Sequence, residues 1–483
     1  MYFFIVFTDH TTGCCPTGKI PRSRAGENSS YRYQARLFLR TPHIQAMKVG
    51  LINSVQDRAG VTIRRQIERM LDERGKKVQM SGRTYEFYDV PGRLIHADGI
   101  DAGLNADLVI FLSRHASVNP VPVLTVHVTG NLRDADMGGS PRALPPAAPA
   151  MMQAVLRELF QNCPAGYRVS YEVTHHGPTD LCHPSFFVEI GSTEKEWGDE
   201  AAGRAVALSV LAATPLDAVP LVGFGGNHYA ARQTEIALTS RGAFGHIAHS
   251  REVSSLDETM IRMMLEKSGA VAAYIDRKSL LKDELHQLTG TLDALCIARL
   301  GETELADMGP LPWETYRASQ ELARTISQKA RCHVHAIGSN GHPEPVRIDP
   351  VLLSEALKAD EQMFLAGLGG LPVIHLSGTD NRPLPVFITY AAYTSRIIND
   401  LNTLCVKIIR IKEITARDGD HLIIQKVRFD PNKARTLGVP AGPLYKALAA
   451  GQAVEISGRV ITPAMVSSGS DIRIHIPGLE NIA

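Results

Sequence analysis

The feature that most constrains this chain is a series of short segments that are apolar along most of their length. Leu108-Val-Ile-Phe-Leu112 contains no polar residue, and the segments 48–53 and 121–128 are similar. A strand with one solvated face alternates apolar and polar residues, whereas a strand buried on both faces is apolar throughout. The segments therefore predict an α/β fold with a mixed, mostly parallel sheet flanked by helices.

Helical patterns separate these apolar segments. Ile63, Ile67 and Met70 recur at helical spacing, and Thr193 with Glu196 has the pattern of a capping box. The expected strands are 48–53, 85–90, 108–112, 121–128, 167–174, 185–190, 218–224 and 270–275. The expected helices are 58–74, 149–161, 194–213, 256–267 and 278–289. This alternation predicts one domain over 47–314, with a mobile Gly-, Pro- and Ala-rich loop at 134–149.

The pattern changes beyond Pro310. Helices are expected at 313–330 and 350–366, followed by strands at 372–376, 385–390 and 404–412 and by a turn-rich segment at 429–466. Residues 315–483 are therefore expected to form a C-terminal α+β accessory domain of uncertain role.

Composition excludes several classes of protein. The seven cysteines form no C-x-x-C pair, which indicates a reduced, cytoplasmic protein without a structural zinc ribbon. No apolar run approaches the roughly 20 residues that span a bilayer. The net charge of +1 gives the whole chain no strong attraction for nucleic acid, so any such binding must be local.

Histidines gather where strands are expected to end. Nine of the 18 histidines lie between His96 and His249, several beside glycine, and active sites of open α/β sheets lie at strand ends. Arg114 and His115 follow the strand 108–112, where they suit either a substrate contact or a capped turn. His127 lies in an apolar strand, and a buried histidine is most often a hydrogen-bonded core residue. The turn at Gly130-Asn131 favours a site at this strand end instead.

The segment Thr174-His-His-Gly-Pro-Thr179 carries paired histidines. Adjacent side chains of a strand point to opposite faces, so His175 and His176 share a site only if the chain bends. Gly177-Pro178 supplies a bend and favours a helix beginning at Thr179, whose N–H groups would bind an anion. Neutral imidazole serves as a general base or a metal ligand. A plain polar turn is the alternative.

Two further motifs hold candidate residues. Glu189 is a carboxylate in an apolar strand, so it needs a metal, an arginine or a histidine as partner. Gly223-Phe-Gly-Gly-Asn-His-Tyr229 ends another strand, and its backbone amides at 225–227 could hold an oxyanion or a phosphate. Substrate contacts are expected from His228, Tyr229 and Arg232, and Gly245-His246 is a further candidate. The chain has no H-E-x-x-H, G-x-S-x-G or P-loop motif.

Taken together, these ordered motifs resemble the archaeal and plant D-aminoacyl-tRNA deacylases from about Met47 to residue 310. The resemblance implies hydrolysis of the ester between a D-amino acid and the 3′ ribose of tRNA, which releases both. It implies a fold similar to peptidyl-tRNA hydrolase and nucleoside phosphorylase domains, and Zn²⁺ as cofactor. Ala231-Arg232-Gln233 departs from the Pro-Arg-His expected in relatives, which puts a ligand role for residue 233 in doubt.

The resemblance gives each candidate residue an expected role. The expected catalytic residues are His127, His175, His176 and Thr179. The expected substrate-binding residues are Arg114, His115, Asn131, Gly225, Gly226, Asn227, Tyr229 and Arg232. The metal ligands are expected among His127, His175, His176, Glu189, His228 and His246. A histidine-held or zinc-activated water would attack the ester carbonyl.

Other functions stay open at this point. One is a metal-free esterase with a histidine base, closer to peptidyl-tRNA hydrolase. The others are a non-catalytic protein that binds the tRNA 3′ end and a nucleoside phosphorylase-like enzyme. The expected partner is the aminoacylated 3′ end of D-aminoacyl-tRNA, with no membrane contact and a monomeric chain.

The two ends of the chain lie outside the main resemblance. Residues 1–46 are basic, and we expect them to be an extension that precedes a start at Met47, or else an RNA-binding arm. The segment Leu437–Tyr445, with Gly458–Pro463, resembles a short stretch near the end of tRNase Z-type proteins. Lys407-Ile-Ile-Arg-Ile-Lys412 favours a half-exposed strand, with tRNA binding as the alternative.

Overall fold

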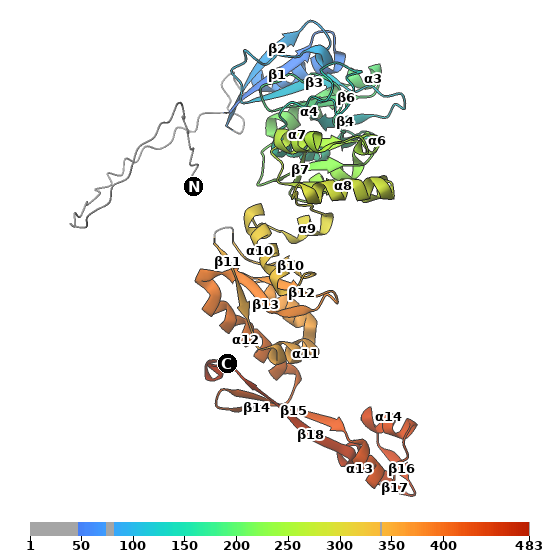
Figure 1. The fold of residues 1–483 in the computed structure, drawn as a ribbon, viewed down its shortest axis with the longest axis vertical. Helices are drawn as coiled ribbons and strands as arrows, with labels where there is room; N and C mark the ends of the chain where they lie inside the picture. The colour runs from blue at the N-terminus through green and yellow to red at the C-terminus, as the bar shows by residue number, and fades with distance from the viewer. Residues whose placement is uncertain (1–46, 74–81, 339–340, 483) are drawn as a thin grey trace, which may run out of the picture. The chain divides into compact units, whose positions relative to one another are not determined.

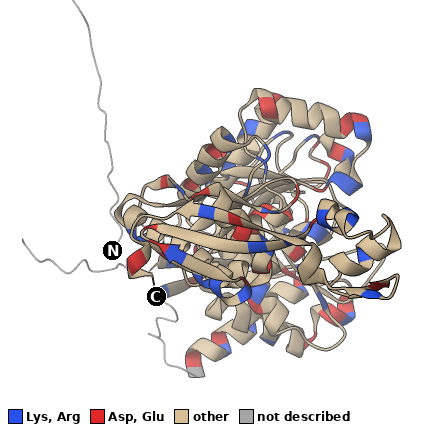
Figure 2. Ribbon diagram, turned by 90° about the horizontal axis from the view of Figure 1, so that it is seen from below, with Lys and Arg blue, Asp and Glu red and all other residues tan. Residues whose placement is uncertain are grey.

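The computed structural model describes residues 47–73, 82–338 and 341–482. The expected extension 1–46 and the last residue of the expected helix 58–74 lie outside the described residues. Lysine and arginine are interspersed with aspartate and glutamate along the ribbon (Figure 2), in keeping with the net charge of +1. No helix of the described part is long and apolar enough to cross a membrane.

Six strands form the first sheet, in the order β2-β1-β3-β6-β4-β5 (Figure 1). Their bounds are β1 Met47–Ser54, β2 Arg83–Val90, β3 Leu108–Arg114, β4 Val123–His127, β5 Arg168–Tyr171 and β6 Ser185–Gly191. Neighbours are parallel except β4 and β6. Every residue of β6, and all of β3 except Arg114, is buried. The predicted mixed, mostly parallel sheet is confirmed.

Helices pack on this sheet through apolar stripes. They are α1 Arg58–Glu73, α2 Pro149–Gln161, α3 Glu194–Trp197 and α4 Glu200–Ala212. Ile63 and Ile67 of α1 are fully buried. The capping box of Thr193 and Glu196 is confirmed, but the single helix predicted over 194–213 is wrong. The Asp199 carboxylate accepts the N–H groups of two residues of α4, so it begins a new helix there.

A second, parallel sheet has the order β8-β7-β9. Its strands are β7 Val219–Phe224, β8 Gly242–Ala248 and β9 Ala272–Ile275, and its helices are α5 Ala231–Thr239, α6 Ser250–Val253, α7 Glu258–Ser268 and α8 Lys282–Ala294. The sequence prediction missed β8, because two glycines weaken its strand pattern. Gly245 is needed there, since a Cβ would lie 2.4 Å from the Ser268 hydroxyl.

The segment after β5 links the two sheets. The predicted strand 167–174 ends at Tyr171, because the next backbone groups bond elsewhere. The N–H of Val173 donates to the carbonyl of His228 at 3.0 Å, and that of Thr174 to the carbonyl of Ile247 at 2.8 Å. This crossing brings loops of both sheets to one place.

The predicted loop 134–149 is irregular up to the start of α2. The backbones of Asn131 and Ala143 exchange hydrogen bonds of 3.0 and 3.1 Å, and Leu144 is buried. These contacts hold both ends of the loop against the fold.

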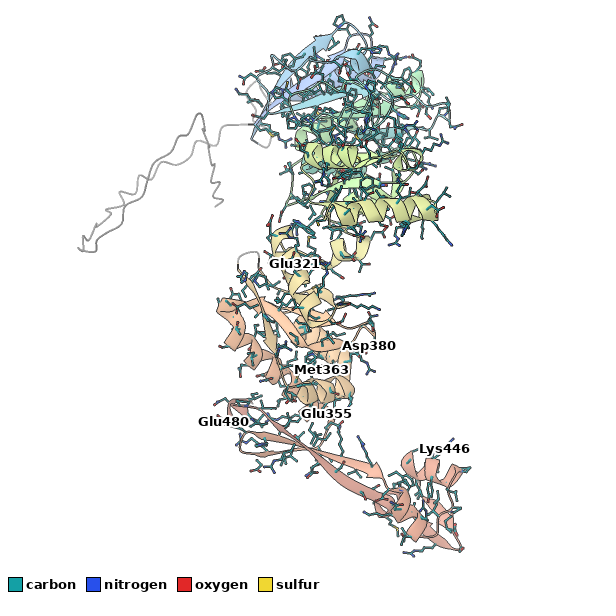
Figure 3. The ribbon with its side chains drawn as sticks, in the orientation of Figure 1. Glu321, Glu355, Met363, Asp380, Lys446 and Glu480 are labelled. Atoms are coloured by element: carbon teal, nitrogen blue, oxygen red, sulfur yellow. The ribbon has the colours of Figure 1, made fainter. Side chains whose placement is uncertain are left out.

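The C-terminal part contains antiparallel sheets. The first, of order β10-β12-β13-β11, comprises β10 Arg331–Val334, β11 Pro343–Arg347, β12 Ile374–Ser377 and β13 Pro383–Tyr390. Its helices are α9 Glu302–Asp307, α10 Trp313–Ile326, α11 Pro350–Leu368, which carries Glu355 (Figure 3), and α12 Thr394–Lys412. The strand predicted at 404–412 is wrong. Cys405, Ile408 and Ile409 are buried at helical spacing, so period 3.6 prevails over the apparent alternation.

The last sheet joins β14 Thr415–Asp418, β15 His421–Phe429 and β18 Ser467–His475. Between β15 and β18 lie α13 Pro431–Thr436, α14 Pro443–Ala449, β16 Val454–Ile456 and β17 Arg459–Ile461. Their apolar side chains form a small cluster around Ala434, Val439, Leu448, Ile461 and Val466. The turn-rich segment therefore has a core of its own.

Candidate active site

Five histidines and two glutamates from separate elements converge on one cluster. Most lie at a strand end or in the loop that follows a strand. They are His115, His127, Glu172, His175, His176, Glu189 and His228. Only His175 and His228 are partly exposed. Six of these seven residues were predicted site residues, and Glu172 was not.

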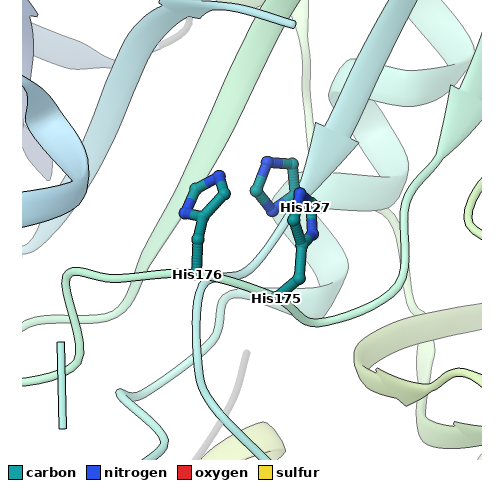
Figure 4. Close-up of side chains that lie close together, drawn as sticks. All are labelled: His127, His175 and His176. Carbon is teal, nitrogen blue, oxygen red and sulfur yellow. The ribbon is translucent and has the colours of Figure 1, made fainter. Parts of the chain in front are cut away.

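Three imidazoles of this cluster, those of His127, His175 and His176, lie side by side (Figure 4) and share one hydrogen-bonding pattern. The Nδ1 of His127, His175 and His176 faces the backbone carbonyl of Val128, Val173 and Gly177, at 3.2, 2.8 and 2.6 Å. The uncharged rings of His175 and His176 then donate from Nδ1 and keep a lone pair on Nε2. This is the orientation of histidines that bind a metal through Nε2. Burial would lower the pKa of His127, but Glu189 and Glu172 outweigh it and raise this pKa, so His127 offers Nε2 to a metal only once its proton is lost.

The paired histidines reach the same cluster because the chain bends between them. His176 has a φ of +50°, in the left-handed region. The rings of His175 and His176 lie 4.4 Å apart, and both lie within 5.0 Å of the His127 ring. Gly177 is required beside the bend, since a Cβ would lie 2.4 Å from the Ile95 carbonyl. The bend predicted here is confirmed, but the helix predicted from Thr179 is absent.

Glu172 is the centre of the second half of the cluster. Its side chain is fully buried, with Oε1 3.0 Å from His115 Nδ1 and Oε2 3.0 Å from His228 Nε2. Neither contact has the alignment of a hydrogen bond, so both carboxylate oxygens remain unsatisfied, as does His127 Nε2. The signal for Glu172 was weaker than that for Glu189, because Glu172 lies in a shorter segment of mixed polarity that directly follows β5.

The charges of the cluster oppose one another. Burial alone would raise the pKa of Glu172, but His115 and His228 hold it well below its usual range. Burial raises the pKa of Glu189. Burial and the neighbouring imidazoles lower the pKa of His175 strongly and that of His176 to about 3. Near neutral pH these two imidazoles are uncharged, as metal ligands must be.

The donor set fits a divalent cation. Three overlapping groups each hold three ligand atoms within 4.8 Å of one another. They are His127-His175-His176, His115-Glu172-His228 and His127-Glu172-Glu189. Imidazole nitrogens and carboxylate oxygens are the ligands that Zn²⁺ takes. Buried donor atoms without a partner are the second observation that indicates a cation here.

His246 has a different place from the other predicted ligands. Its Nε2 donates to the Pro145 carbonyl at 3.0 Å, and its Nδ1 accepts from the Thr174 hydroxyl at 3.1 Å. The same hydroxyl accepts the N–H of Ile247. Both ring nitrogens therefore serve the fold, and none is left to bind a metal.

His246 predicts acid sensitivity of the fold. Burial lowers the pKa of His246 from 6.5 to about 4. Between these two pH values His246 is protonated in the unfolded chain but neutral in the folded chain. The stabilisation is complete above about pH 6.5 and is lost as pH falls to about 4, amounting to about 3 kcal/mol. Urea unfolding across this range should give a flatter pH dependence for His246→Gln than for the parent. Parallel profiles would contradict the prediction.

A cavity of about 630 Å³ opens beside the cluster. Its lining includes His115, His175, His176, Glu189 and His228. Its volume lies within the roughly 300–1,000 Å³ of small-molecule sites. The cluster therefore faces a space large enough for a substrate.

Thr179 and Asn131 are among the predicted site residues that lie outside this lining. Thr179 accepts the N–H of Ser140, and its own N–H donates to Asp98 at 2.6 Å. The Asn131 amide donates to the carbonyls of Gly138 and Ser140. Both side chains thus hold the loop that carries Met137, which does line the cavity.

The glycine-rich loop after β7 differs from its predicted role. The N–H of Gly225 donates to the Ala248 carbonyl and that of Gly226 to the Ser279 hydroxyl, at 2.9 and 2.7 Å. Neither amide is therefore free to hold an oxyanion or a phosphate. The buried Gln233 donates to the Gly225 carbonyl, so the residue that departs from the family pattern supports this loop.

The remaining predicted contacts divide into two kinds. The Tyr229 hydroxyl lies 3.1 Å from His115 Nε2 and belongs to the site, and the Asn227 side chain accepts the N–H of Tyr229. Arg232 instead pairs with Glu235 and Glu302. Arg232 is thus engaged outside the cavity.

The fold and the cluster define an α/β enzyme with a metal-compatible histidine–carboxylate centre. Residues 102–299 match the sequence model of a family described as D-aminoacyl-tRNA deacylase. A D-aminoacyl-tRNA deacylase of Methanoregula boonei is 61% identical over 436 residues, which cover 90% of this chain and 100% of the relative. That of Methanoculleus marisnigri is 52% identical, over 90% of this chain and 99% of the relative. The chain belongs to the D-aminoacyl-tRNA deacylase family.

A solved structure shares about half of the fold. The crystal structure described as a conserved protein of unknown function, AF0625, matches with a TM-score of 0.50 and 30% identity. The match covers 54% of this chain and 97% of that chain. The similarity supports the mixed α/β architecture.

Proposed function

We propose that this chain hydrolyses the ester bond of D-aminoacyl-tRNA and releases the free D-amino acid and tRNA. Family membership supports this activity. The observation that supports a specific location for this activity is the convergence of five histidines and two glutamates beside a cavity of about 630 Å³. Ester hydrolysis needs a positioned water, a proton acceptor and stabilisation of a developing oxyanion, and this cluster can supply them.

We propose a zinc ion as cofactor. His127, His175 and His176 would hold it through Nε2, and Glu172 would extend the set toward His115 and His228, which leaves Glu189 available as a base. Bound zinc polarises a carbonyl oxygen and lowers the pKa of water to about 7. The backbone carbonyls at Nδ1 orient the rings and fix their tautomers.

Residues beside the cavity would transfer the proton and orient an imidazole. Glu189 lines the cavity and lies 3.7 Å from His127 Nε2, so it is placed to accept a proton as water attacks the ester. The proton then passes to the 3′ oxygen of the ribose as the ester bond breaks. Tyr229 would hold His115 in its orientation through the 3.1 Å contact.

The geometry weighs against the alternative functions. A metal-free histidine base needs one free imidazole nitrogen, whereas three converge here. A binding protein gains nothing from buried unsatisfied carboxylate oxygens. A phosphorylase needs anion donors, and the amides of Gly225 and Gly226 are engaged within the fold.

The domain roles and the finer fold class belong to the same proposal. We assign catalysis to the domain formed by residues 47–314. We expect the fold of this domain to be related to those of peptidyl-tRNA hydrolase and nucleoside phosphorylase. We assign an accessory role in holding tRNA to 315–483. The substrate of such an enzyme implies a cytoplasmic location.

Enantiomer-resolved deacylation tests the proposed function. D-tyrosyl-tRNA should be hydrolysed roughly a hundredfold faster than L-tyrosyl-tRNA, because the pocket must reject the correct substrate of translation. The assay follows release of labelled tyrosine by the chains 1–483 and 47–483, and equal rates for these two chains would assign no role to the extension. Equal decay of D-tyrosyl-tRNA with and without protein would support the binding function instead.

A further inference from the structure

An arginine and a tryptophan form a stacked pair at the wall of the cavity. The Arg114 guanidinium lies over the Trp197 ring, 4.9 Å from its centroid. Both side chains line the cavity together with His115 and His175. The proposed chemistry uses neither side chain of the pair.

The pair is held rigidly from behind. The Trp197 indole N–H donates to the His115 carbonyl at 2.9 Å, and the ring packs against the main core. The backbone N–H of Arg114 donates to Asp57 at 3.0 Å, and the Ser113 hydroxyl donates to the same oxygen. The platform is therefore fixed relative to the catalytic cluster through His115.

The hydrogen-bond donors of the Arg114 guanidinium are unused among the described residues. Within the described residues, no hydrogen bond or ion pair engages the Arg114 side chain, whereas Arg58 nearby pairs with Glu194. A guanidinium stacked on an indole presents a flat, polarised surface on which a second planar ring can stack. Arg114 thus has both a supported face and an unused set of donors.

We infer that the Arg114–Trp197 pair is the stacking platform for the adenine base at the 3′ end of tRNA. The inference rests on the proposed function and deepens it. The ester is attached to the ribose of this terminal adenosine, so the base must lie close to the catalytic cluster. Stacking on aromatic rings and guanidinium planes is how proteins bind unpaired bases. Since every tRNA ends in adenosine, one platform serves every amino acid.

Two small substrates isolate the base. D-tyrosyl-adenosine carries the base without tRNA phosphates, and D-tyrosyl ethyl ester carries neither. Arg114→Ala should lower the preference for the adenosine ester over the ethyl ester, measured as the ratio of kcat/KM values, by about tenfold, which is about 1.4 kcal/mol. The loss should lie mainly in KM, because the platform binds the substrate without taking part in the reaction.

Further variants separate stacking from charge. Arg114→Lys keeps the charge but not the plane, so it should lose as much as Arg114→Ala. Trp197→Phe keeps a ring and should lose less. The matched control is Arg93→Ala, which removes another cation from the same cavity and should leave the ratio within about twofold.

Specific outcomes would overturn the inference. An unchanged ratio in Arg114→Ala would show that the base lies elsewhere. Full activity of Arg114→Lys would show that Arg114 acts through its charge and not through its plane. A loss seen with tRNA but not with D-tyrosyl-adenosine would show that Arg114 binds a phosphate. Failure of the parent chain to hydrolyse D-tyrosyl-tRNA would instead refute the proposed function, so the two failures are distinguishable.

Discussion

Glu172→Gln is expected to lower the rate of D-tyrosyl-tRNA deacylation by roughly a hundredfold to a thousandfold. The substitution keeps the size of the side chain but removes its charge. His115 and His228 then lose the carboxylate that lies 3.0 Å from each, and two of the three candidate ligand groups lose a member. Single-turnover deacylation and the zinc content of the purified variant measure the effect.

Glu355→Gln is a matched control for this prediction. Glu355 is also a buried carboxylate, but it pairs with Lys358 and Lys426 in the C-terminal part. Its replacement should reduce the free energy of unfolding without a comparable loss in hydrolysis of D-tyrosyl-adenosine. If Glu172→Gln stays folded and keeps its rate within fivefold of the parent, the assignment of Glu172 to the site is wrong.

The sequence could predict that the site residues lie near the ends of buried strands, but it could not predict which of their side chains are in contact. Runs such as Leu108–Leu112 report burial directly, because both faces of a central strand exclude water. The contact between His115 and Glu172 joins residues 57 positions apart, and no local pattern encodes it. Glu189 was found because it interrupts a longer apolar run, whereas Glu172 lies just where β5 ends.

Misread roles share one physical cause. A glycine-rich turn predicts free amides only if no neighbouring chain satisfies them, and here Ala248 and Ser279 do. His246 and Thr179 likewise bond to segments distant in sequence. Hydrogen bonds of this kind are set by the tertiary structure, so residue type alone could not separate supporting residues from reacting ones.

Removal of metal is expected to lower deacylation at least about a hundredfold, with recovery on addition of zinc. The reason lies in the arrangement of the unpaired donors. His127 Nε2 and both oxygens of Glu172 are buried without a hydrogen-bond partner, and three overlapping groups of histidine and glutamate each bring three ligand atoms within 4.8 Å of one another. A bound cation would offset the cost of burying these atoms. The protein is dialysed against chelator and assayed on D-tyrosyl-tRNA before and after zinc is restored.

Stability provides an independent measurement of the same site. A ligand that binds only the folded chain raises its stability, by about 2.7 kcal/mol at a hundred times its Kd. Zinc should therefore raise the Tm of the chelated parent, and His176→Asn should reduce this rise. His249→Asn is the control, because the Nδ1 of His249 caps a short helix outside the cluster. Undiminished activity after chelation, with no zinc-dependent rise in Tm, would leave the cluster as a metal-free centre in which Glu189 acts as the proton acceptor.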